Sequence, residues 1–251
     1  MNIVCVIPAR YASSRFPGKP LALIDGKPMI QWVYRRAMRC SNISRVFVAT
    51  NDTRIAAACA AFSAPVVMTA PDLPSGTDRV YAAIKDLDVD VVINMQGDEP
   101  FVRPDLLDEL AALFADEQIQ IATPIKKINS TSDLNDPNLV RVVRDVDGNA
   151  LYFSRASIPF SRGIDDSGER LKRHTFYKHI GIYAYRKNIL AELTHLRESS
   201  LEKTERLEQL RFLENGFRIY THITSYESIS IDTPHDLEQA NQQIKTKKET
   251  F

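Results

Sequence analysis

Residues 3–21 read Ile3-Val4-Cys5-Val6-Ile7-Pro8-Ala9-Arg10-Tyr11-Ala12-Ser13-Ser14-Arg15-Phe16-Pro17-Gly18-Lys19-Pro20-Leu21. The apolar run at 3–7 predicts a fully buried strand. The loop that follows carries Arg10, Arg15 and Lys19 among small residues. An arginine offers phosphate oxygens a planar fork, and a lysine offers them a point charge. The loop is therefore a candidate cradle for a polyphosphate, and the alternative is a solvated basic loop.

Apolar runs and helical patterns alternate along residues 1–100. Strands are predicted at 45–50, 65–68 and 89–95, and helices after Pro28, from Asp52 to about Phe62 and from Pro74 to about Leu87. Such alternation with short links predicts an α/β fold with a mostly parallel, Rossmann-like sheet flanked by helices. Ligands bind these sheets at the carboxyl ends of the strands. Both the 10–19 loop and the 96–100 loop lie at such ends, so we expect them to face one cleft.

The middle of the chain has a different pattern. Residues 140–153 predict a hairpin that turns at Asp147-Gly148, and residues 179–186 predict one returning strand. Residues 159–173 show no clear period and predict a mobile loop. Two helical patterns, a strand at 218–223, a short strand or loop at 229–234, a helix at 234–244 and a frayed tail complete the chain. We interpret residues 1–251 as a single domain in which about 140–186 form an insertion.

The composition excludes several classes of protein. The 251 residues are 44% hydrophobic and 25% charged, as in globular proteins. Lys plus Arg equal Asp plus Glu at 32 each, so no nucleic acid or anionic membrane is expected as a partner. No apolar run approaches the roughly 20 residues that span a bilayer, and no signal peptide pattern is seen. The three scattered cysteines form neither a disulfide framework nor a zinc pattern, so we expect a cytoplasmic protein.

Two aspartates, Asp98 and Asp232, each follow an apolar run. The carboxylate of Asp98, next to Gly97, suits an Mg²⁺ ion shared between the protein and substrate phosphates. The structural alternative for Asp98 is a turn residue before the helix that starts at Pro104. The alternative for Asp232 is an N-cap before a helix with Pro234 in its first turn.

Taken together, these segments resemble the 3-deoxy-manno-octulosonate (KDO) cytidylyltransferases, also called CMP-KDO synthetases. The resemblance covers nearly the whole chain and rests on the opening run from Ile7 to Leu21, Ser75-Gly76-Thr77-Asp78-Arg79, Gln96-Gly97-Asp98-Glu99-Pro100, Ala150-Leu151-Tyr152-Phe153-Ser154-Arg155 with Ile158-Pro159, His179-Ile180-Gly181-Ile182-Tyr183, Leu207-Glu208-Gln209-Leu210-Arg211 and Asp232-Thr233-Pro234. His235 stands where the family more often has an acidic residue. We expect that change to be harmless, because Asp232 carries the ligand role.

The resemblance implies a nucleotidyltransferase sheet, a hairpin insertion used for dimerisation, and hence a homodimer. It implies that CTP is bound by Pro8, Ala9, Arg10, Arg15, Lys19, Ser75, Gly76, Thr77, Arg79, Gln96 and Asp98. By the same resemblance Lys19, Arg10 and Asp98 are catalytic, and Asp98 and Asp232 hold Mg²⁺. The sugar acid is bound by His179, Tyr183, Glu208 and Gln209. The implied reaction transfers CMP from CTP to KDO, releases pyrophosphate and gives CMP-KDO for lipopolysaccharide biosynthesis.

The candidate sugar-binding residues have structural alternatives. A strand histidine such as His179 is otherwise a satisfied core residue. Tyr183, four residues on, would share its strand face. Glu208 and Gln209 would otherwise be solvated helix residues, with Glu208 able to pair with Arg211.

Two other functions remain open at this point. One is a cytidylyltransferase for a related sugar acid, such as 8-amino-KDO or a sialic acid. The other is a non-catalytic nucleotide-binding protein on the same fold. The enzymatic interpretation requires Asp98 and Asp232, far apart in sequence, to converge with the basic loop on one bound nucleotide.

Overall fold

The computed structural model describes residues 1–12, 16–227 and 229–247. Arg15, one of the three predicted phosphate-binding cations, lies outside the described residues. The chain divides into two compact units, the first formed by residues 1–112, 184–194 and 228–251 and the second by residues 113–183 and 195–227. The interpretation of the chain as one domain with an insertion at about 140–186 stays a prediction.

The first unit is built on a sheet with strand order β5-β4-β1-β6-β11. Its central strand β1 (Ile3–Ala9) pairs in parallel with β4 (Arg45–Thr50) and β6 (Val91–Asn94), and β4 pairs in parallel with β5 (Val66–Met68). Every residue of β1 is buried, as an apolar strand inside a parallel sheet should be. The unit also contains most of β11 (Tyr183–Arg186) and an antiparallel ribbon of β2 (Leu23–Ile24) and β3 (Lys27–Pro28).

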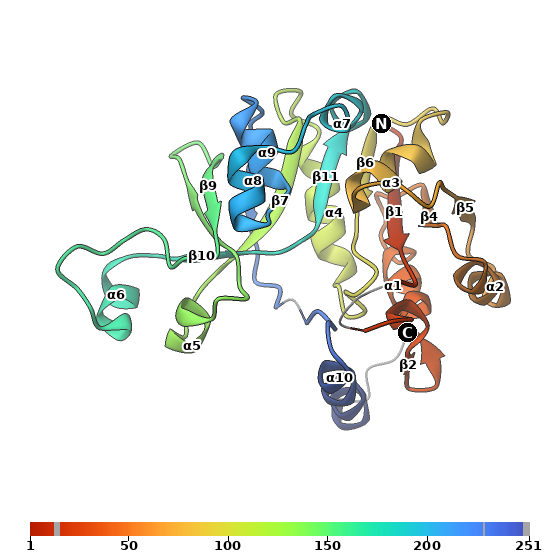
Figure 1. The fold of residues 1–251 in the computed structure, drawn as a ribbon, viewed down its shortest axis with the longest axis horizontal. Helices are drawn as coiled ribbons and strands as arrows, with labels where there is room; N and C mark the ends of the chain where they lie inside the picture. The colour runs from red at the N-terminus through yellow and green to blue at the C-terminus, as the bar shows by residue number, and fades with distance from the viewer. Residues whose placement is uncertain (13–15, 228, 248–251) are drawn as a thin grey trace. The chain divides into compact units, whose positions relative to one another are not determined.

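Helices flank this sheet (Figure 1). They are α1 (Met29–Ala37), α2 (Thr53–Ala61), α3 (Gly76–Ile84), α4 (Pro104–Leu113), α7 (Lys187–Leu193) and α10 (Pro234–Lys247), with a short 3-10 helix η1 (Lys19–Leu21) in the first loop. Asp52 caps α2 by accepting a hydrogen bond from the Arg54 amide, as the sequence predicts. The predicted α/β class, with a mostly parallel sheet flanked by helices, is confirmed. None of the described helices is long and apolar enough to cross a membrane.

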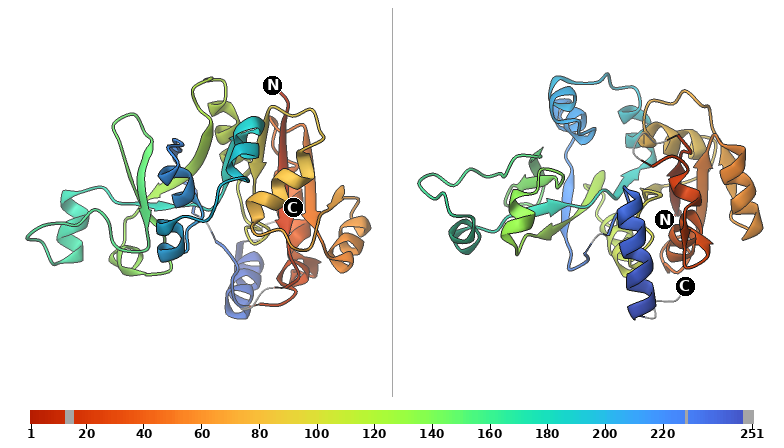
Figure 2. Two further views of the ribbon diagram at one scale, coloured as in Figure 1. Left: turned by 45° about the horizontal axis from the view of Figure 1, so that its top comes forward. Right: turned by 60° about the horizontal axis from the view of Figure 1, so that its bottom comes forward.

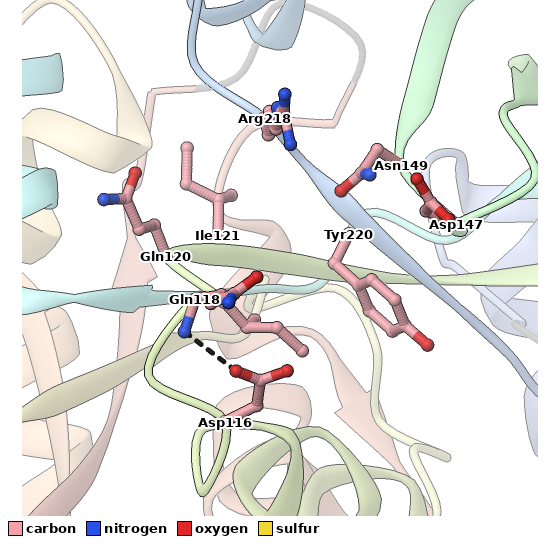
Figure 3. Close-up of a pocket in the computed structure, with 9 residues that line it drawn as sticks. Asp116, Gln118, Gln120, Ile121, Asp147, Asn149, Arg218 and Tyr220 are labelled. Carbon is pink, nitrogen blue, oxygen red and sulfur yellow. Dashed lines mark hydrogen bonds between the residues drawn. The ribbon is translucent and has the colours of Figure 1, made fainter.

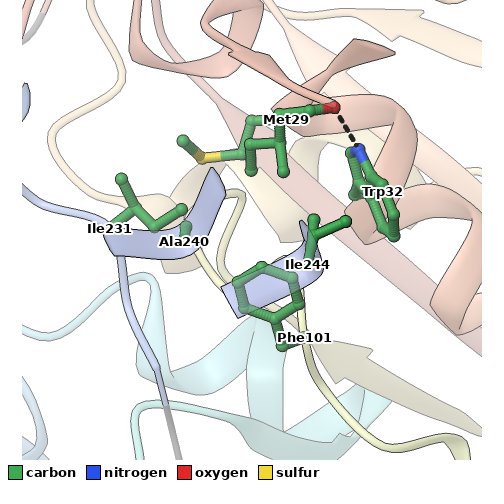
Figure 4. Packing of buried hydrophobic residues seen from close by; sticks show 7 residues of the cluster. Met29, Trp32, Phe101, Ile231, Ala240 and Ile244 are labelled. Carbon is green, nitrogen blue, oxygen red and sulfur yellow. Dashed lines mark hydrogen bonds between the residues drawn. The ribbon is translucent and has the colours of Figure 1, made fainter. Parts of the chain in front are cut away.

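An apolar cluster fixes the C-terminal segment to the first unit (Figure 4). It joins residues from both ends of the chain to Phe101, and its members are Ile24, Met29, Trp32, Phe101, Ile231, Ala240 and Ile244. The indole Nε1 of Trp32 donates a hydrogen bond of 2.8 Å to the carbonyl of Ile24. As a result α10 lies beside β2, which Figures 1 and 2 both show. The helix reaches Lys247, beyond its predicted end, and the rest of the predicted frayed tail lies outside the described residues.

The second unit contains a mixed sheet. Its strand β7 (Ile121–Lys127) pairs antiparallel with β10 (Tyr177–His179) and parallel with β12 (Tyr220–Ile223). The predicted hairpin at 140–153 is present as β8 (Arg141–Arg144) and β9 (Ala150–Ser154), with Gly148 of its turn at φ +94°. Antiparallel pairing of β10 with β8 joins the hairpin to the sheet. The helices of this unit are α5 (Thr131–Asn135), α6 (Ser167–Arg173), α8 (Ser200–Glu205) and α9 (Gln209–Glu214).

Two predictions for this part of the chain are wrong. The predicted loop at 159–173 contains the helix α6, whose N-cap Asp166 accepts from the Glu169 amide. Because α6 buries none of its residues, no apolar periodicity marks it in the sequence. The single strand predicted at 179–186 is two strands, β10 and β11, because residues 180–182 leave the extended conformation. The strand β7 and the helix α5 have no counterpart in the sequence prediction.

Replacing Trp32 with alanine should lower the free energy of unfolding by about 3–5 kcal/mol, because the change opens a cavity in the cluster and removes the donor to the Ile24 carbonyl. Urea denaturation followed by far-UV circular dichroism measures the loss. Leu23→Ala is the matched control, since Leu23 is 56% exposed and its truncation should cost at most about 0.5 kcal/mol. A loss below about 1 kcal/mol for Trp32→Ala would contradict a central role for the cluster.

Candidate active site

Two aspartates from opposite ends of the chain converge on Lys19. Its Nζ lies 2.7 Å from Oδ2 of Asp98 and 3.1 Å from Oδ1 of Asp232. A backbone hydrogen bond of 3.0 Å from the Ile231 amide to the Asp98 carbonyl joins the two carboxylate-bearing segments directly. The expected convergence of these carboxylates with the basic loop is therefore seen, and all three side chains belong to the first unit.

The ion pairs set the charge of Lys19. Burial by itself would lower the pKa of the ammonium, but Asp98 and Asp232 outweigh burial and raise the pKa above its ordinary value. The ammonium is consequently charged at neutral pH. The turn before η1 holds Lys19 in place, because Gly18 adopts φ +74°, a left-handed conformation that suits glycine. The Gly18 amide also donates to the Tyr11 carbonyl at 2.9 Å and closes the loop.

The structural alternatives for the two aspartates do not describe their side chains. Helix α10 is capped by Thr233 and Asp236: Thr233 Oγ1 accepts from the Asp236 amide, and Asp236 Oδ2 accepts from the amides of Thr233 and Asp232. The carboxylate of Asp232 is directed to Lys19 instead of the cap. Asp98 does lie in a turn before α4, which begins at Pro104, as its alternative predicted, but its carboxylate pairs with Lys19.

A pocket of about 260 Å³ opens beside Lys19 at the carboxyl ends of β1 and β6 and the start of α3. Seven of the predicted nucleotide-binding residues line it, namely Pro8, Ala9, Arg10, Lys19, Gly76, Gln96 and Asp98. Ala12, Pro20 and Gly97 also line the pocket and were not predicted as nucleotide-binding residues. Their positions beside the predicted residues of the same two loops could have indicated them. At Gly97 a Cβ would lie 3.2 Å from the Pro8 carbonyl oxygen, so glycine permits the close approach of the two strand ends.

Three other predicted nucleotide-binding residues shape the first unit from outside this pocket. Ser75 caps α3 by accepting from the Asp78 amide, and Thr77 is buried in the first turn of that helix. Arg79 is fully buried, and its guanidinium donates to Thr69 Oγ1 and to a neighbouring carbonyl. Burial and the nearby Arg10 lower the pKa of Arg79. Direct contact of these three residues with a nucleotide stays a prediction.

The donor chemistry of Asp98 and Asp232 fits Mg²⁺. This cation is commonly held by one or two carboxylates together with substrate phosphates. The two carboxylates already face one cationic point, the Lys19 ammonium. Across residues 1–12, 16–227 and 229–247, no cluster of three or more His, Cys, Asp or Glu could hold a metal by itself. A metal at this place would therefore need the further ligands that a triphosphate supplies.

The candidate sugar-binding residues lie in the second unit. His179 Nε2 is 2.9 Å from Thr123 Oγ1, and its ring packs against Phe153 and Tyr183 with centroids 5.2 and 5.3 Å away. Burial lowers the pKa of His179 to about 3, so the imidazole is neutral. The prediction that His179 and Tyr183 share the face of one strand is wrong, because they come from β10 and β11, but their rings do meet.

Glu208 and Gln209 lie at the start of α9. Glu208 Oε1 accepts a 2.8 Å hydrogen bond from Arg211 Nη2, so the predicted pairing is confirmed. Gln209 is only 6% exposed, which rules out the solvated position that its helix pattern suggested. Binding of a sugar acid by these two residues stays a prediction.

The second unit contains a polar pocket of about 300 Å³ in which none of the predicted site residues takes part (Figure 3). Its lining includes Asp116, Asp147 and Arg218, so the acidic side chains outnumber the one cation. The Gln118 amide donates to Asp116 Oδ1 at 2.9 Å. Such a charge balance suits a triphosphate less well than the pocket beside Lys19 does.

Residues 4–229 match a family model described as cytidylyltransferase. The 3-deoxy-manno-octulosonate cytidylyltransferase of Cytophaga hutchinsonii is 49% identical over 239 residues, which cover 94% of this chain and 95% of that protein. This chain belongs to the 3-deoxy-manno-octulosonate cytidylyltransferase family. The Bacteroides thetaiotaomicron member is also 49% identical, over 98% of this chain and 100% of that protein. A solved structure of CMP:2-keto-3-deoxy-manno-octonic acid synthetase complexed with CTP matches at TM-score 0.91 and 40% identity, and the match covers 98% of this chain and 100% of that chain.

The neutral state of half-buried His179 predicts a pH dependence of stability. Its pKa of about 3 lies below the ordinary value of 6.5, so between these values the unfolded chain binds a proton that the folded chain does not. The free energy of unfolding should therefore fall as pH falls through this window, by up to about 3 kcal/mol between pH 7 and pH 4.

His179→Gln isolates this contribution, because glutamine does not titrate. Urea denaturation at several pH values should show a shallower loss of stability on acidification for the variant than for the original protein. Parallel pH profiles for the two proteins would contradict a neutral His179 in the folded chain.

Proposed function

We propose that this chain transfers CMP from CTP to KDO, releasing pyrophosphate and forming CMP-KDO, a precursor for lipopolysaccharide. The observation that carries the proposal is the meeting of Lys19, Asp98 and Asp232 at the edge of the pocket beside β1 and β6. Two carboxylates that can hold Mg²⁺, beside the cations Lys19 and Arg10, suit a reaction between an anionic triphosphate and an anionic sugar acid. Membership of the family and the activity for which the relatives are named support the same reaction.

The reaction is a displacement at the α-phosphorus of CTP. The anomeric hydroxyl oxygen of KDO loses its proton to solvent and forms a bond to phosphorus, the bond to the bridging oxygen of the β-phosphate breaks, and pyrophosphate leaves. Because both reactants are anionic, the barrier is governed by positioning and by neutralisation of charge. Arg10 and Lys19 line the pocket and neutralise the phosphates. No nucleophilic side chain is required, and no covalent enzyme intermediate is expected.

Asp98 and Asp232 are the residues that would hold Mg²⁺. When bound, the ion supplies Lewis-acid polarisation of a phosphoryl oxygen and lowers the pKa of a coordinated hydroxyl. The protein's own part is to keep the two carboxylates together, which it does through the hydrogen bond between the Ile231 amide and the Asp98 carbonyl. The apolar cluster around Ile231 stabilises that arrangement.

The sugar acid is recognised by His179, Tyr183, Glu208 and Gln209. Since His179 is neutral and bonded to Thr123, it contributes as a hydrogen-bonding partner of a hydroxyl group and not as a general acid. The same four residues decide between KDO and a related acid, such as 8-amino-KDO or a sialic acid.

The working form is a cytoplasmic homodimer. The hairpin of β8 and β9 supports dimerisation, because Val146 at its turn is 100% exposed and Leu151 on β9 is 61% exposed. The buried thiols of Cys5, Cys40 and Cys59, which form no disulfide, support a reducing compartment.

Pyrophosphate release tests the proposed reaction. The purified chain is incubated with CTP and KDO, with 8-amino-KDO or with a sialic acid, in each case with Mg²⁺ and with a chelator. Turnover with CTP and KDO that requires Mg²⁺ is the expected result. Turnover only with another acid would show that this acid, and not KDO, is the substrate. No pyrophosphate release with any acid would refute the enzymatic proposal.

Asp98→Asn should lower kcat by about 100-fold or more, because it removes a charged ligand at the reacting phosphate. Steady-state kinetics at saturating Mg²⁺ measures the change, and circular dichroism checks the fold. Asp105→Asn is the control, since Asp105 is an exposed carboxylate paired with Arg103 away from the pocket. Near-normal turnover in Asp98→Asn would remove this residue from the mechanism.

Lys19→Ala should raise KM for CTP by about tenfold or more, because the phosphates lose a charged hydrogen-bond donor. The control is Lys85→Ala, whose side chain is 58% exposed and outside the pocket. CTP kinetics that stay the same in Lys19→Ala would reject the phosphate cradle.

A further inference from the structure

The ammonium group of Lys19 has two proposed kinds of binding partner, the carboxylates and the phosphates. In the described structure it donates to Asp98 Oδ2 and Asp232 Oδ1, the carboxylates assigned above to the metal. It also lines the pocket assigned to the triphosphate. The side chain is only 15% exposed, so water screens these contacts poorly. Two cations that share the same pair of carboxylates at short range would repel each other strongly.

We propose that Lys19 competes with the divalent cation for Asp98 and Asp232, so that the nucleotide-free protein binds the cation weakly and takes it up together with the triphosphate. The inference rests on the proposed function, since it takes the two aspartates as the metal-binding residues. It adds a property of the protein without substrate: the ammonium occupies the place of the metal until the nucleotide arrives.

The phosphates offer Lys19 an alternative set of acceptors within the same pocket. Lysine carries its charge on a flexible four-carbon stem, so the ammonium can change partners while the backbone stays in place. The backbone that carries the two carboxylates is held in place, because the Ile231 amide bonds to the Asp98 carbonyl and the side chain of Ile231 is fully buried. The exchange therefore needs a movement of the Lys19 side chain and no separation of these two segments.

The exchange also keeps the aspartates neutralised in both states. Asp98 and Asp232 are 27% and 38% exposed, so removing the Lys19 ammonium would take a positive charge away from two adjacent carboxylates in a partly desolvated place. An uncompensated charge in such a place is costly. Lys19 compensates the pair before binding, and the divalent cation does so afterwards, while Lys19 compensates the phosphates.

Binding of Mn²⁺ to the nucleotide-free protein tests the competition, with electron paramagnetic resonance reporting the unbound ion. The original protein should bind weakly, and Lys19→Met should bind Mn²⁺ about tenfold more tightly or better, since one tenfold step corresponds to about 1.4 kcal/mol of relieved repulsion. Lys19→Gln is a second neutral variant that keeps a hydrogen-bond donor near the carboxylates, in case methionine disturbs the fold. It should show the same gain.

Three further variants make the result specific. Lys19→Arg keeps the charge and should remain as weak as the original protein. Lys85→Met removes a lysine that lies 4.0 Å from a carboxylate outside the pocket and should change nothing. Adding Asp98→Asn to Lys19→Met should abolish the gain in Mn²⁺ affinity. Equal affinity in the original protein and both neutral variants would overturn the proposal, as would a gain that survives Asp98→Asn.

The outcome is separable from that of the proposed function. Mn²⁺ binding needs neither CTP nor a sugar acid, whereas the reaction is tested by pyrophosphate release from the original protein. If the neutral Lys19 variants gain Mn²⁺ affinity but the original protein releases no pyrophosphate, the competition is supported and the proposed reaction is refuted. If the original protein releases pyrophosphate but the variants show no gain, the reaction is supported and the competition is refuted.

Discussion

The ion pairs of Lys19 with Asp98 and Asp232 hold together three segments that are far apart in the sequence. Two carboxylates in one partly buried place repel each other unless a cation lies between them. The ammonium supplies that cation, and its own burial is offset by the two negative charges. The pocket for the proposed nucleotide, the proposed metal ligands and the entry to the last helix all meet at this contact. The ion pairs therefore neutralise the two carboxylates before any substrate binds.

The parallel sheet explains why the first two of these segments meet. Strands β1 and β6 are neighbours and run in the same direction, so the loops after them leave from the same edge. One loop carries Lys19 and the other carries Asp98. The third segment has no such topological reason, because Asp232 follows no strand of this sheet. It is brought in by the apolar cluster in which Ile231, Ala240 and Ile244 pack against Trp32 (Figure 4).

This difference also explains what the sequence could predict. Periodicity and capping residues predicted β1, the N-cap of α2 and the hairpin turn at Gly148, because each depends on neighbours in the chain. Helix α6 was missed because it buries none of its residues, and the break between β10 and β11 is marked in the sequence only by Gly181. The prediction that Asp98 and Asp232 lie close together rested on the family resemblance alone. No local feature of either segment reports a contact that depends on packing of a helix more than a hundred residues away.

The candidate residues of the two units differ in their electrostatics, and the difference follows the chemistry proposed for them. In the first unit the side chains are charged and compensate one another, as a site that exchanges partners with phosphates and a metal should. In the second unit His179 is neutral and Gln209 is buried, which suits hydrogen bonding to hydroxyl groups. Glu208 is the charged member, and Arg211 already pairs with it. Because Arg211 holds Oε1 of Glu208, loss of Arg211 would change the orientation of Glu208 and weaken any sugar-binding role that it has.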